Sequence, residues 1–213
     1  MSSPSRLSQF AGLSQLGIHL LAVSKGQPAS EIRSLFIEGQ IDFGESRLQE
    51  ALTKFDVLND LQEIRWHFIG RLQANKVRGV VKSFDVIHSV DSIKLAKRIS
   101  RIAGEENKMP LIMFQVKFRK DDKKTGFEVD ELLEAWTKLI TLPNVRICGL
   151  MTIPPAGLDR HGTKNLFKEC RNLADQLSLQ DCSMGMSRDW EDAIEAGATW
   201  IRLGSILFGE RHK

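Results

Sequence analysis

Lys25 is the residue whose type and position could do the most chemistry in this sequence. It follows the short apolar run Ile18–Val23 in the stretch GIHLLAVSKGQP, and Pro28 then opens a helical pattern. In α/β enzymes, functional side chains gather at the carboxyl ends of buried parallel strands. A lysine amine placed there can form a Schiff base with an aldehyde once its proton affinity is lowered. The position is typical of a carbonyl-binding lysine, although an ordinary solvated loop lysine also fits it.

Candidate phosphate-binding groups follow the last two apolar runs of the chain. In SMGMSRDWEDAI, Ser187 precedes a helical pattern, and we expect it to be the N-cap of that helix. In IRLGSILFG, Gly204 allows close approach of a ligand to the backbone, and Ser205 supplies a hydroxyl. The loops after the last two strands of a (β/α)8 barrel commonly bind phosphate. Together with the lysine, these groups fit an aldehyde that carries a phosphate, such as pyridoxal 5′-phosphate (PLP) or a sugar phosphate.

The elements that must position these residues alternate regularly between apolar runs and amphipathic helical patterns. The predicted strands are Ile18–Val23, Ile41–Phe43, Trp66–Ile69, Val86–Val90, Leu111–Phe118, Arg146–Met151, Cys182–Met184 and Trp200–Leu203. Strands that alternate with helices indicate parallel pairing through right-handed crossovers. We therefore predict an α/β fold, a single-domain (β/α)8 TIM barrel over residues 1–213, with an open doubly wound sheet as the alternative.

Composition excludes several classes of protein. The net charge is only +3, with acidic and basic residues mixed along the chain, which argues against a nucleic-acid-binding protein. No apolar stretch approaches the ~20 residues that span a bilayer, and the first residues lack a signal-peptide layout, so we expect a cytoplasmic protein without membrane contact. The three cysteines suggest no disulfide framework, and the histidines show no metal-ligand spacing.

Several blocks of the sequence resemble the pyridoxal phosphate homeostasis proteins, a family also named after proline synthetase co-transcription. The blocks follow the family's order from about Leu20 to Arg211: LLAVSKGQP, DFGESRLQEA, WHFIGRLQANK, IHSVDS, GLMTIPP and SMGMSRDWEDAIEAGATWIRLGSILFGER. The resemblance implies a barrel of the type found in the amino-terminal half of alanine racemases, which is a fold type III PLP protein. It also implies a set of cofactor-binding residues: Lys25, Ser46, Met184, Gly185, Met186, Ser187, Arg202, Gly204 and Ser205.

The resemblance assigns these residues separate roles. It implies that Lys25 carries PLP as a Schiff base and that Ser187, with the backbone of Gly204 and Ser205, contacts the phosphate. Arg202 is expected to point towards the ring or the phosphate. An arginine near the ring nitrogen discourages protonation of that nitrogen and weakens the ring as an electron sink. This suits a carrier better than a fast carbanion enzyme.

Two positions depart from the family pattern. The family usually reads G-E-N-R where this chain has Gly44-Glu45-Ser46-Arg47, and it often reads I-G-H-L-Q where this chain has Arg71. The serine can still donate a hydrogen bond, but it reaches less far than an amide. Neither change affects the lysine or the phosphate contacts.

The resemblance implies a protein of intracellular PLP (vitamin B6) homeostasis, without fast turnover. We expect a non-catalytic monomer that binds PLP and hands it to apo-enzymes that need it. The alternative is an alanine-racemase-like enzyme. Racemases of this fold pair the lysine with a tyrosine from a carboxyl-terminal β-domain, whereas this chain stops after the barrel and contains no tyrosine. Cys148 and Cys182 could replace the phenol, but we expect both in the core.

A sugar-phosphate barrel enzyme is the other alternative. It would need a carboxylate base at a strand end, and Glu45 and Asp91 are available there. We expect Glu45 instead to pair with Arg47 or to cap a helix. His67 and His88 lie in predicted strands, and we expect them to be hydrogen-bonded core residues rather than catalytic ones.

Overall fold

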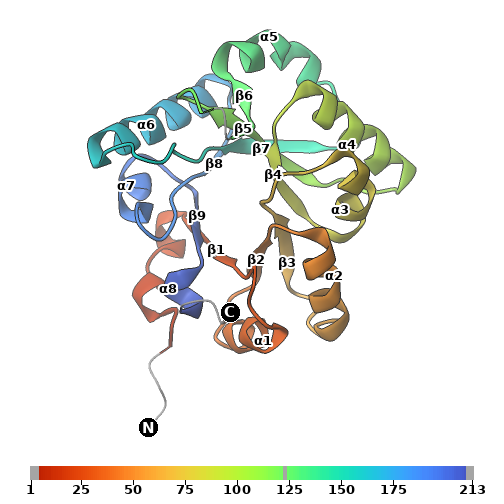
Figure 1. Ribbon diagram of the computed structural model, residues 1–213, viewed down its shortest axis with the longest axis vertical. Helices are drawn as coiled ribbons and strands as arrows, with labels where there is room; N and C mark the ends of the chain where they lie inside the picture. Colours follow the sequence, from red (N-terminus) through yellow and green to blue (C-terminus); the bar gives the residue numbers. More distant parts are fainter. Residues whose placement is uncertain (1–4, 122–123, 210–213) are drawn as a thin grey trace.

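A ring of parallel strands surrounded by helices forms the protein, as a computed structural model shows for residues 5–121 and 124–209 (Figure 1). The predicted domain 1–213 extends beyond these described residues. The strands are β1 (His19–Val23), β2 (Asp42–Glu45), β3 (Arg65–Phe68), β4 (Val86–Val90), β5 (Leu111–Lys117), β6 (Phe127–Glu128), β7 (Arg146–Met151), β8 (Asp181–Ser183) and β9 (Trp200–Leu203). Each of the eight predicted strands is present: the bounds of β4, β7 and β9 agree with the prediction, and those of the other five differ by one or two residues.

The sheet closes on itself. Its strand order is β4-β3-β2-β1-β9-β8-β7-β5, and a further pairing of β4 with β5 completes the ring. All these pairings are parallel, for example Ala22 with Phe43 and His19 with Trp200. The short β6 pairs only with the end of β5 and lies outside the ring. The prediction of a (β/α)8 barrel is therefore confirmed, and the open sheet is excluded.

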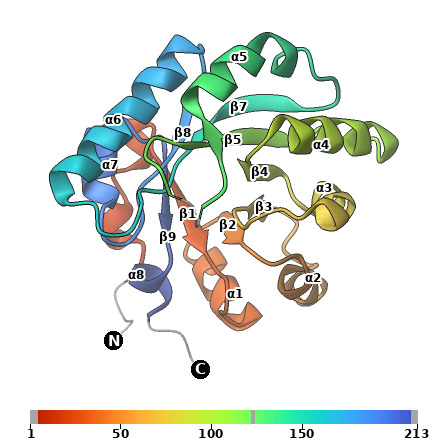
Figure 2. The ribbon, with the colours of Figure 1, turned by 45° about the horizontal axis from the view of Figure 1, so that its top comes forward.

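Helices connect the strands and cover the outside of the ring, as the tilted view shows (Figure 2). The α-helices are α1 (Ala29–Ile37), α2 (Leu48–Val57), α3 (Val77–Ser83), α4 (Ile93–Glu105), α5 (Val129–Leu139), α6 (Arg160–Gln176), α7 (Trp190–Glu195) and α8 (Ser205–Phe208). Three 3-10 helices add to them: η1 (Ser8–Phe10), η2 (Ser14–Leu16) and η3 (Ala74–Lys76). In the described part of the chain, no helix is long and apolar enough to cross a bilayer.

Local sequence explains several helix ends. Ser92 is the N-cap of α4, where its hydroxyl accepts the Leu95 N–H. Asp159 does the same for α6 through the Gly162 N–H at 2.7 Å. Helix α1 ends just before Gly39, whose φ of 104° favours glycine.

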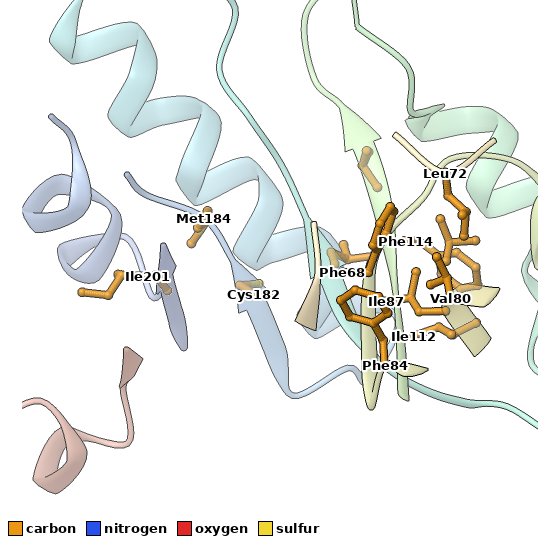
Figure 3. Packing of buried hydrophobic residues seen from close by; sticks show 14 of the residues in the cluster. Phe68, Leu72, Val80, Phe84, Ile87, Ile112, Phe114, Cys182, Met184 and Ile201 are labelled. Carbon is orange, nitrogen blue, oxygen red and sulfur yellow. The ribbon is translucent and has the colours of Figure 1, made fainter. Parts of the chain in front are cut away.

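The core has two parts because side chains alternate between the two faces of each strand. The larger part lies between the ring and the helices, and Figure 3 shows some of it, including Phe68, Ile87 and Phe114 beside Val80 and Phe84. The smaller part is an apolar cluster around Leu21, Val86, Met113, Met151 and Trp200. Polar side chains from the same strands are also buried, notably Asp42, His67, His88, Ser183 and Arg202.

Candidate functional site

A cavity of about 720 Å³ opens at the carboxyl ends of the strands. Its size suits a small organic ligand. It is lined by Val23, Lys25, Gln27, Ser46, Ile69, Met151, Ile153, Met186, Ser187, Arg202, Gly204, Ser205 and Gly209. The fold thus brings together seven of the nine residues predicted for the site, from loops that are far apart in the sequence. Met184 and Gly185 are the two that do not line it.

Lys25 stands in a tight turn directly after β1. The Ser24 N–H donates to the Gly44 carbonyl at 3.0 Å, which keeps the chain on the sheet for one residue beyond Val23. The Gln27 N–H then donates back to the Ser24 carbonyl at 3.0 Å. Gly26 completes the turn with a φ of 73°, a left-handed conformation that favours glycine. The half-buried Lys25 consequently reaches the cavity from a fixed backbone.

A buried ionic cluster holds this turn from behind. The Lys54 ammonium, on α2, donates to the Ser24 carbonyl at 2.9 Å, to Glu45 Oε1 at 2.7 Å and to Glu50 Oε1 at 2.8 Å. The Ser24 hydroxyl donates to the same Glu45 oxygen at 2.7 Å, and the Gly26 N–H donates to Glu50. Both residues that flank Lys25 are therefore tied to one lysine and two carboxylates.

The expected pairing of Glu45 with Arg47 is wrong. Glu45 is fully buried and pairs with Lys54, because the side chains of β2 that face α2 meet the helix rather than the solvent. Burial raises the pKa of Glu45 above its usual value, and the nearby Glu50 adds to this, against the opposing effects of Lys54 and Ser24.

The opposite wall of the cavity is built from the loops after β8 and β9. Ser187 and Ser205 lie side by side, with the Ser205 hydroxyl donating to the Ser187 hydroxyl at 3.3 Å. Gly204 has a φ of −117°, and a Cβ there would come no closer than 3.4 Å to the Val23 carbonyl. Neither backbone conformation nor packing therefore demands glycine at 204, which leaves close approach of a ligand as a reason for it.

Ser187 is not the N-cap that we expected. Helix α7 begins at Trp190, and its N-cap is Asp189. The Asp189 carboxylate accepts the Met186 N–H at 2.6 Å, and the Asp189 N–H donates to the Met186 carbonyl at 3.0 Å. This closed turn delays the start of the helix and leaves the Ser187 hydroxyl at the cavity instead of on the helix.

Met184 and Gly185 contribute to packing. Met184 is fully buried in the larger apolar core. Gly185 has a φ of 87°, and a Cβ there would lie 2.6 Å from Ala193 Cβ on α7. Glycine at 185 thus allows α7 to pack closely against the end of β8. A direct contact of these two residues with a cofactor stays a prediction.

Arg202 lies in β9, and its side chain lines the cavity with only 4% of the residue's surface exposed. Its Nη1 donates to the Ser183 hydroxyl at 2.9 Å, and its Nη2 donates to the Thr152 carbonyl at 3.0 Å. Burial lowers the pKa of Arg202 to about 10, which still leaves a cation at neutral pH. The site therefore combines an amine, a guanidinium and three hydroxyls, those of Ser46, Ser187 and Ser205.

Among the described residues, no carboxylate lines the cavity. Glu45 and Asp91, the two acids that a sugar-phosphate enzyme could have used, are not among the lining residues. The thiols are also unsuited to proton transfer, because burial raises the pKa of Cys148 to about 12 and a contact with Cys182 raises that of Cys170. Within the same part of the chain, no group of three or more metal-ligating side chains gathers. The site offers amine, hydroxyl and guanidinium chemistry.

Sequence reasoning missed several lining residues. They are Val23, Gln27, Ile69, Met151, Ile153 and Gly209. Val23, Ile69 and Met151 lie at or just beyond strand ends, so their position in the barrel could have identified them. Gln27 could not be found in this way, because it lies in the loop after Lys25 and is buried only by the fold.

Comparison with known proteins gives a consistent result. The family model for the alanine racemase N-terminal domain matches residues 5–212. A curated pyridoxal phosphate homeostasis protein from Synechocystis is 46% identical over 99% of this chain and 100% of its own length. Another from Aquifex aeolicus is 40% identical over 94% of this chain and 90% of its own.

Solved structures agree with the fold. PipY from Synechococcus elongatus, solved without PLP, has a TM-score of 0.92 and 45% identity, and the match covers 96% of this chain and 98% of PipY. A second PipY structure, with PLP bound, has a TM-score of 0.91.

Proposed function

The chain belongs to the pyridoxal phosphate homeostasis protein family, and we propose that it binds PLP in the cavity around Lys25 and acts in intracellular vitamin B6 homeostasis. PLP is an aldehyde that also carries a phosphate, and it condenses with amines through the aldehyde. Lys25 supplies the amine, and Ser187, Gly204 and Ser205 are proposed to bind the phosphate.

One observation carries this proposal. Lys25 and the pair Ser187 and Ser205 line the same cavity of about 720 Å³, although they come from opposite ends of the sequence. The cavity supplies polar groups for both ends of the cofactor and apolar side chains, such as Ile69 and Met151, for its ring. PLP bound to PipY, a close relative in sequence and fold, supports the same use of the cavity.

Arg202 favours binding over turnover. A guanidinium can only donate hydrogen bonds, so a cofactor nitrogen that faces it must accept one and stay unprotonated. An unprotonated ring is a weak electron sink. Arg202 is buried and charged at neutral pH, which supports a role beside the cofactor ring.

The absence of a second proton-transferring group in the site also favours a non-catalytic role. A racemase needs an acid or base on each face of the cofactor. The sequence contains no tyrosine, and the described lining residues include no carboxylate and no thiol. We infer that the protein holds and releases PLP, and that it acts on amino acids slowly or not at all.

Three further features belong to this proposal. We propose that the protein works in the cytoplasm, as a monomer, and delivers PLP to apo-enzymes. The large exposed apolar residues are spread over separate elements, among them Leu16, Ile37, Val57 and Met109, which favours a monomer. Lys25 lies at an open cavity and is half-buried, so an incoming amine can approach it.

Covalent labelling tests the anchor. Borohydride treatment of the PLP-loaded protein, followed by peptide mapping, should find the pyridoxyl group on Lys25. The variant Lys25→Ala should retain no label, while the matched variant Lys76→Ala should keep it. A label on Lys76 or Lys117 in the unmodified protein would contradict the assignment.

Binding measurements test the phosphate contacts. Hydrogen bonds to a charged group are worth about 1.5–3 kcal/mol, so Ser187→Ala should weaken PLP retention by about tenfold or more. Pyridoxal, which lacks the phosphate, should bind poorly to the unmodified protein. Equal affinity for PLP and pyridoxal would argue against a phosphate site.

An activity assay tests the non-catalytic role. The PLP-loaded protein should show negligible conversion of L-alanine to D-alanine, and it should restore activity to an apo-enzyme mixed with it. Racemisation at a rate ordinary for enzymes, ~10 per second, would restore the racemase alternative.

A further inference from the structure

A continuous chain of buried hydrogen bonds crosses the inside of the barrel and ends on Arg202. The Arg202 guanidinium donates to Ser183 Oγ at 2.9 Å, and Ser183 Oγ lies 2.9 Å from His88 Nδ1. His88 Nε2 lies 2.8 Å from His67 Nδ1, and His67 Nε2 lies 2.9 Å from Asp42 Oδ1. The five residues come from β9, β8, β4, β3 and β2, and none is more than 6% exposed.

The two ends of the chain fix the direction of its protons. Arginine can only donate and an ionised aspartate can only accept. Ser183 therefore accepts from Arg202 and donates to His88, which donates to His67, which donates to Asp42. Every hydrogen bond is satisfied with both imidazoles neutral. Burial lowers the pKa of His67, and burial together with the neighbouring His67 and Arg202 side chains lowers that of His88 well below its usual value.

The far end of the chain is anchored. Arg65 donates to both oxygens of Asp42, from Nε at 2.5 Å and from Nη2 at 3.0 Å. The Trp200 ring packs against His67, with centroids 4.9 Å apart, and the Arg65 guanidinium lies 5.4 Å from the centroid of the same ring. The imidazoles consequently have little freedom to turn, and the position of Arg202 is set by the barrel interior.

We propose that Asp42, His67, His88 and Ser183 are positioning residues that hold the Arg202 guanidinium towards the cofactor and thereby keep the cofactor's ring nitrogen unprotonated. This inference rests on the proposed function, since it requires PLP in the cavity. Asp42, His67 and His88 would act in this way without touching the ligand.

In this arrangement the Arg202 guanidinium is held by a hydroxyl, on Ser183, and by a carbonyl, on Thr152, rather than by a carboxylate. A carboxylate in contact with the guanidinium would neutralise much of its field. Here the negative charge lies on Asp42, and three neutral side chains, those of Ser183, His88 and His67, separate it from Arg202. Arg202 is held by polar contacts and keeps its positive charge for the ligand.

The test compares serine variants. Ser183→Ala removes the link to Arg202, whereas Ser183→Thr keeps a hydroxyl on a residue suited to a strand. His67→Phe breaks the chain further away with a ring of similar size. The matched control is Ser100→Ala, which removes another buried serine hydroxyl, bonded to the Pro143 carbonyl on the outside of the barrel. Each variant is loaded with PLP that carries ¹⁵N in its ring.

The ¹⁵N chemical shift of the ring nitrogen and the dissociation constant of PLP are measured for each protein. In Ser183→Ala and His67→Phe, the signal should move towards the protonated form, and the dissociation constant should rise roughly two- to tenfold. Ser183→Thr should restore the signal of the unmodified protein, and Ser100→Ala should leave it unchanged.

The outcomes separate the two proposals. If the unmodified protein binds no PLP at Lys25, the proposed function fails. If it binds PLP but Ser183→Ala gives the same nitrogen signal as the unmodified protein, the positioning role is overturned and the proposed function stands. An equal shift in Ser100→Ala would also overturn it, because a general loss of stability would then explain the effect.

Discussion

The two ends of strand β2 carry buried carboxylates that behave in opposite ways. Asp42, at the start of the strand, accepts hydrogen bonds on both oxygens, from Arg65 and from His67. Glu45, at its end, accepts from Lys54 and Ser24 on Oε1 alone, and its buried Oε2 has no hydrogen-bond partner among the described residues. Burial raises the pKa of both, but the Asp42 partners outweigh it and leave that pKa lowered, whereas the pKa of Glu45 stays raised.

The difference shows that the number of partners, more than burial, decides the charge of a buried acid. The region around Asp42 is a saturated network that keeps its charge and fixes the barrel interior. The region around Glu45, directly behind the Lys25 turn, holds its negative charge less firmly. The more firmly charged carboxylate therefore belongs to the network that ends on Arg202, whereas the Lys25 turn lies against Glu45, which takes up a proton more readily.

The largest loss of stability should come from replacing Lys54, the cation that pairs with Glu45. Lys54→Met leaves Glu45 and Glu50 without their shared partner, and breaking a buried pair in this way costs about 3–5 kcal/mol of unfolding free energy. Urea unfolding should detect this loss. The exposed control Lys138→Met should lie within about 0.5 kcal/mol of the unmodified protein.

The double variant Lys54→Met with Glu45→Gln sharpens this test. It removes the buried charge together with its partner, so it should recover part of the lost stability. A single Lys54→Met variant as stable as the unmodified protein would show that the cluster does not brace the Lys25 turn.

A smaller effect is expected at Asp42. Asp42→Asn weakens the hydrogen bonds with Arg65 and His67 and should cost about 1–3 kcal/mol at neutral pH. Because the folded pKa lies below the ordinary 3.8, the carboxylate contributes stability above that value and loses the contribution as the pH falls through the folded pKa. Urea unfolding at several pH values should therefore show the gap between the two proteins narrowing in acid. A gap that is constant with pH would contradict the assignment of charge to Asp42.

Glu45→Gln should change the stability least, and the pH dependence of its effect should be opposite to that of Asp42→Asn. The folded pKa lies above the ordinary 4.5, so the folded state binds the proton more tightly than the unfolded state. The unmodified protein should lose stability relative to Glu45→Gln as the pH rises from 4.5 through the folded pKa. The same pH series measures this. If the unmodified protein instead gained stability over that range, the pKa of Glu45 would be lowered, and the contrast with Asp42 would disappear.

The fold could be predicted from the sequence because apolar strands and amphipathic helices alternate so regularly. Several short elements escaped prediction for physical reasons, and β6 and α3 are two examples. The short strand β6, Phe127–Glu128, exists only through its pairing with the end of β5. Helix α3, Val77–Ser83, has only seven residues, too few for a clear periodic pattern.

The candidate site was predictable where it depends on strand ends. Lys25, Gly204 and Ser205 follow predicted strands directly, so the barrel alone brings them to one cavity. The Lys54 cluster was not predictable, because the spacing of Glu50 and Lys54 is that of an ordinary exposed pair on a helix, and only the packing of α2 against β2 buries it.

The histidines show the same limit in the barrel interior. The expectation that His67 and His88 are hydrogen-bonded core residues is confirmed. Their partners could not be named from the sequence, because contacts across a barrel depend on the tilt and stagger of strands that a linear pattern does not reveal. For the same reason, Ser183 and Asp42 could not be identified from the sequence as members of this hydrogen-bonded chain.

The pairing of β1 with β9 has a consequence for the order of events during synthesis. His19 meets Trp200 across this pair, so β1, which leads into the Lys25 turn, must wait with one side unpaired until almost the whole barrel has emerged from the ribosome. Lys25 and Arg202 can face each other only after that closure. A growing or shortened chain would present a lysine without its pocket, and under the proposed function the capture of PLP would report that the barrel has finished folding.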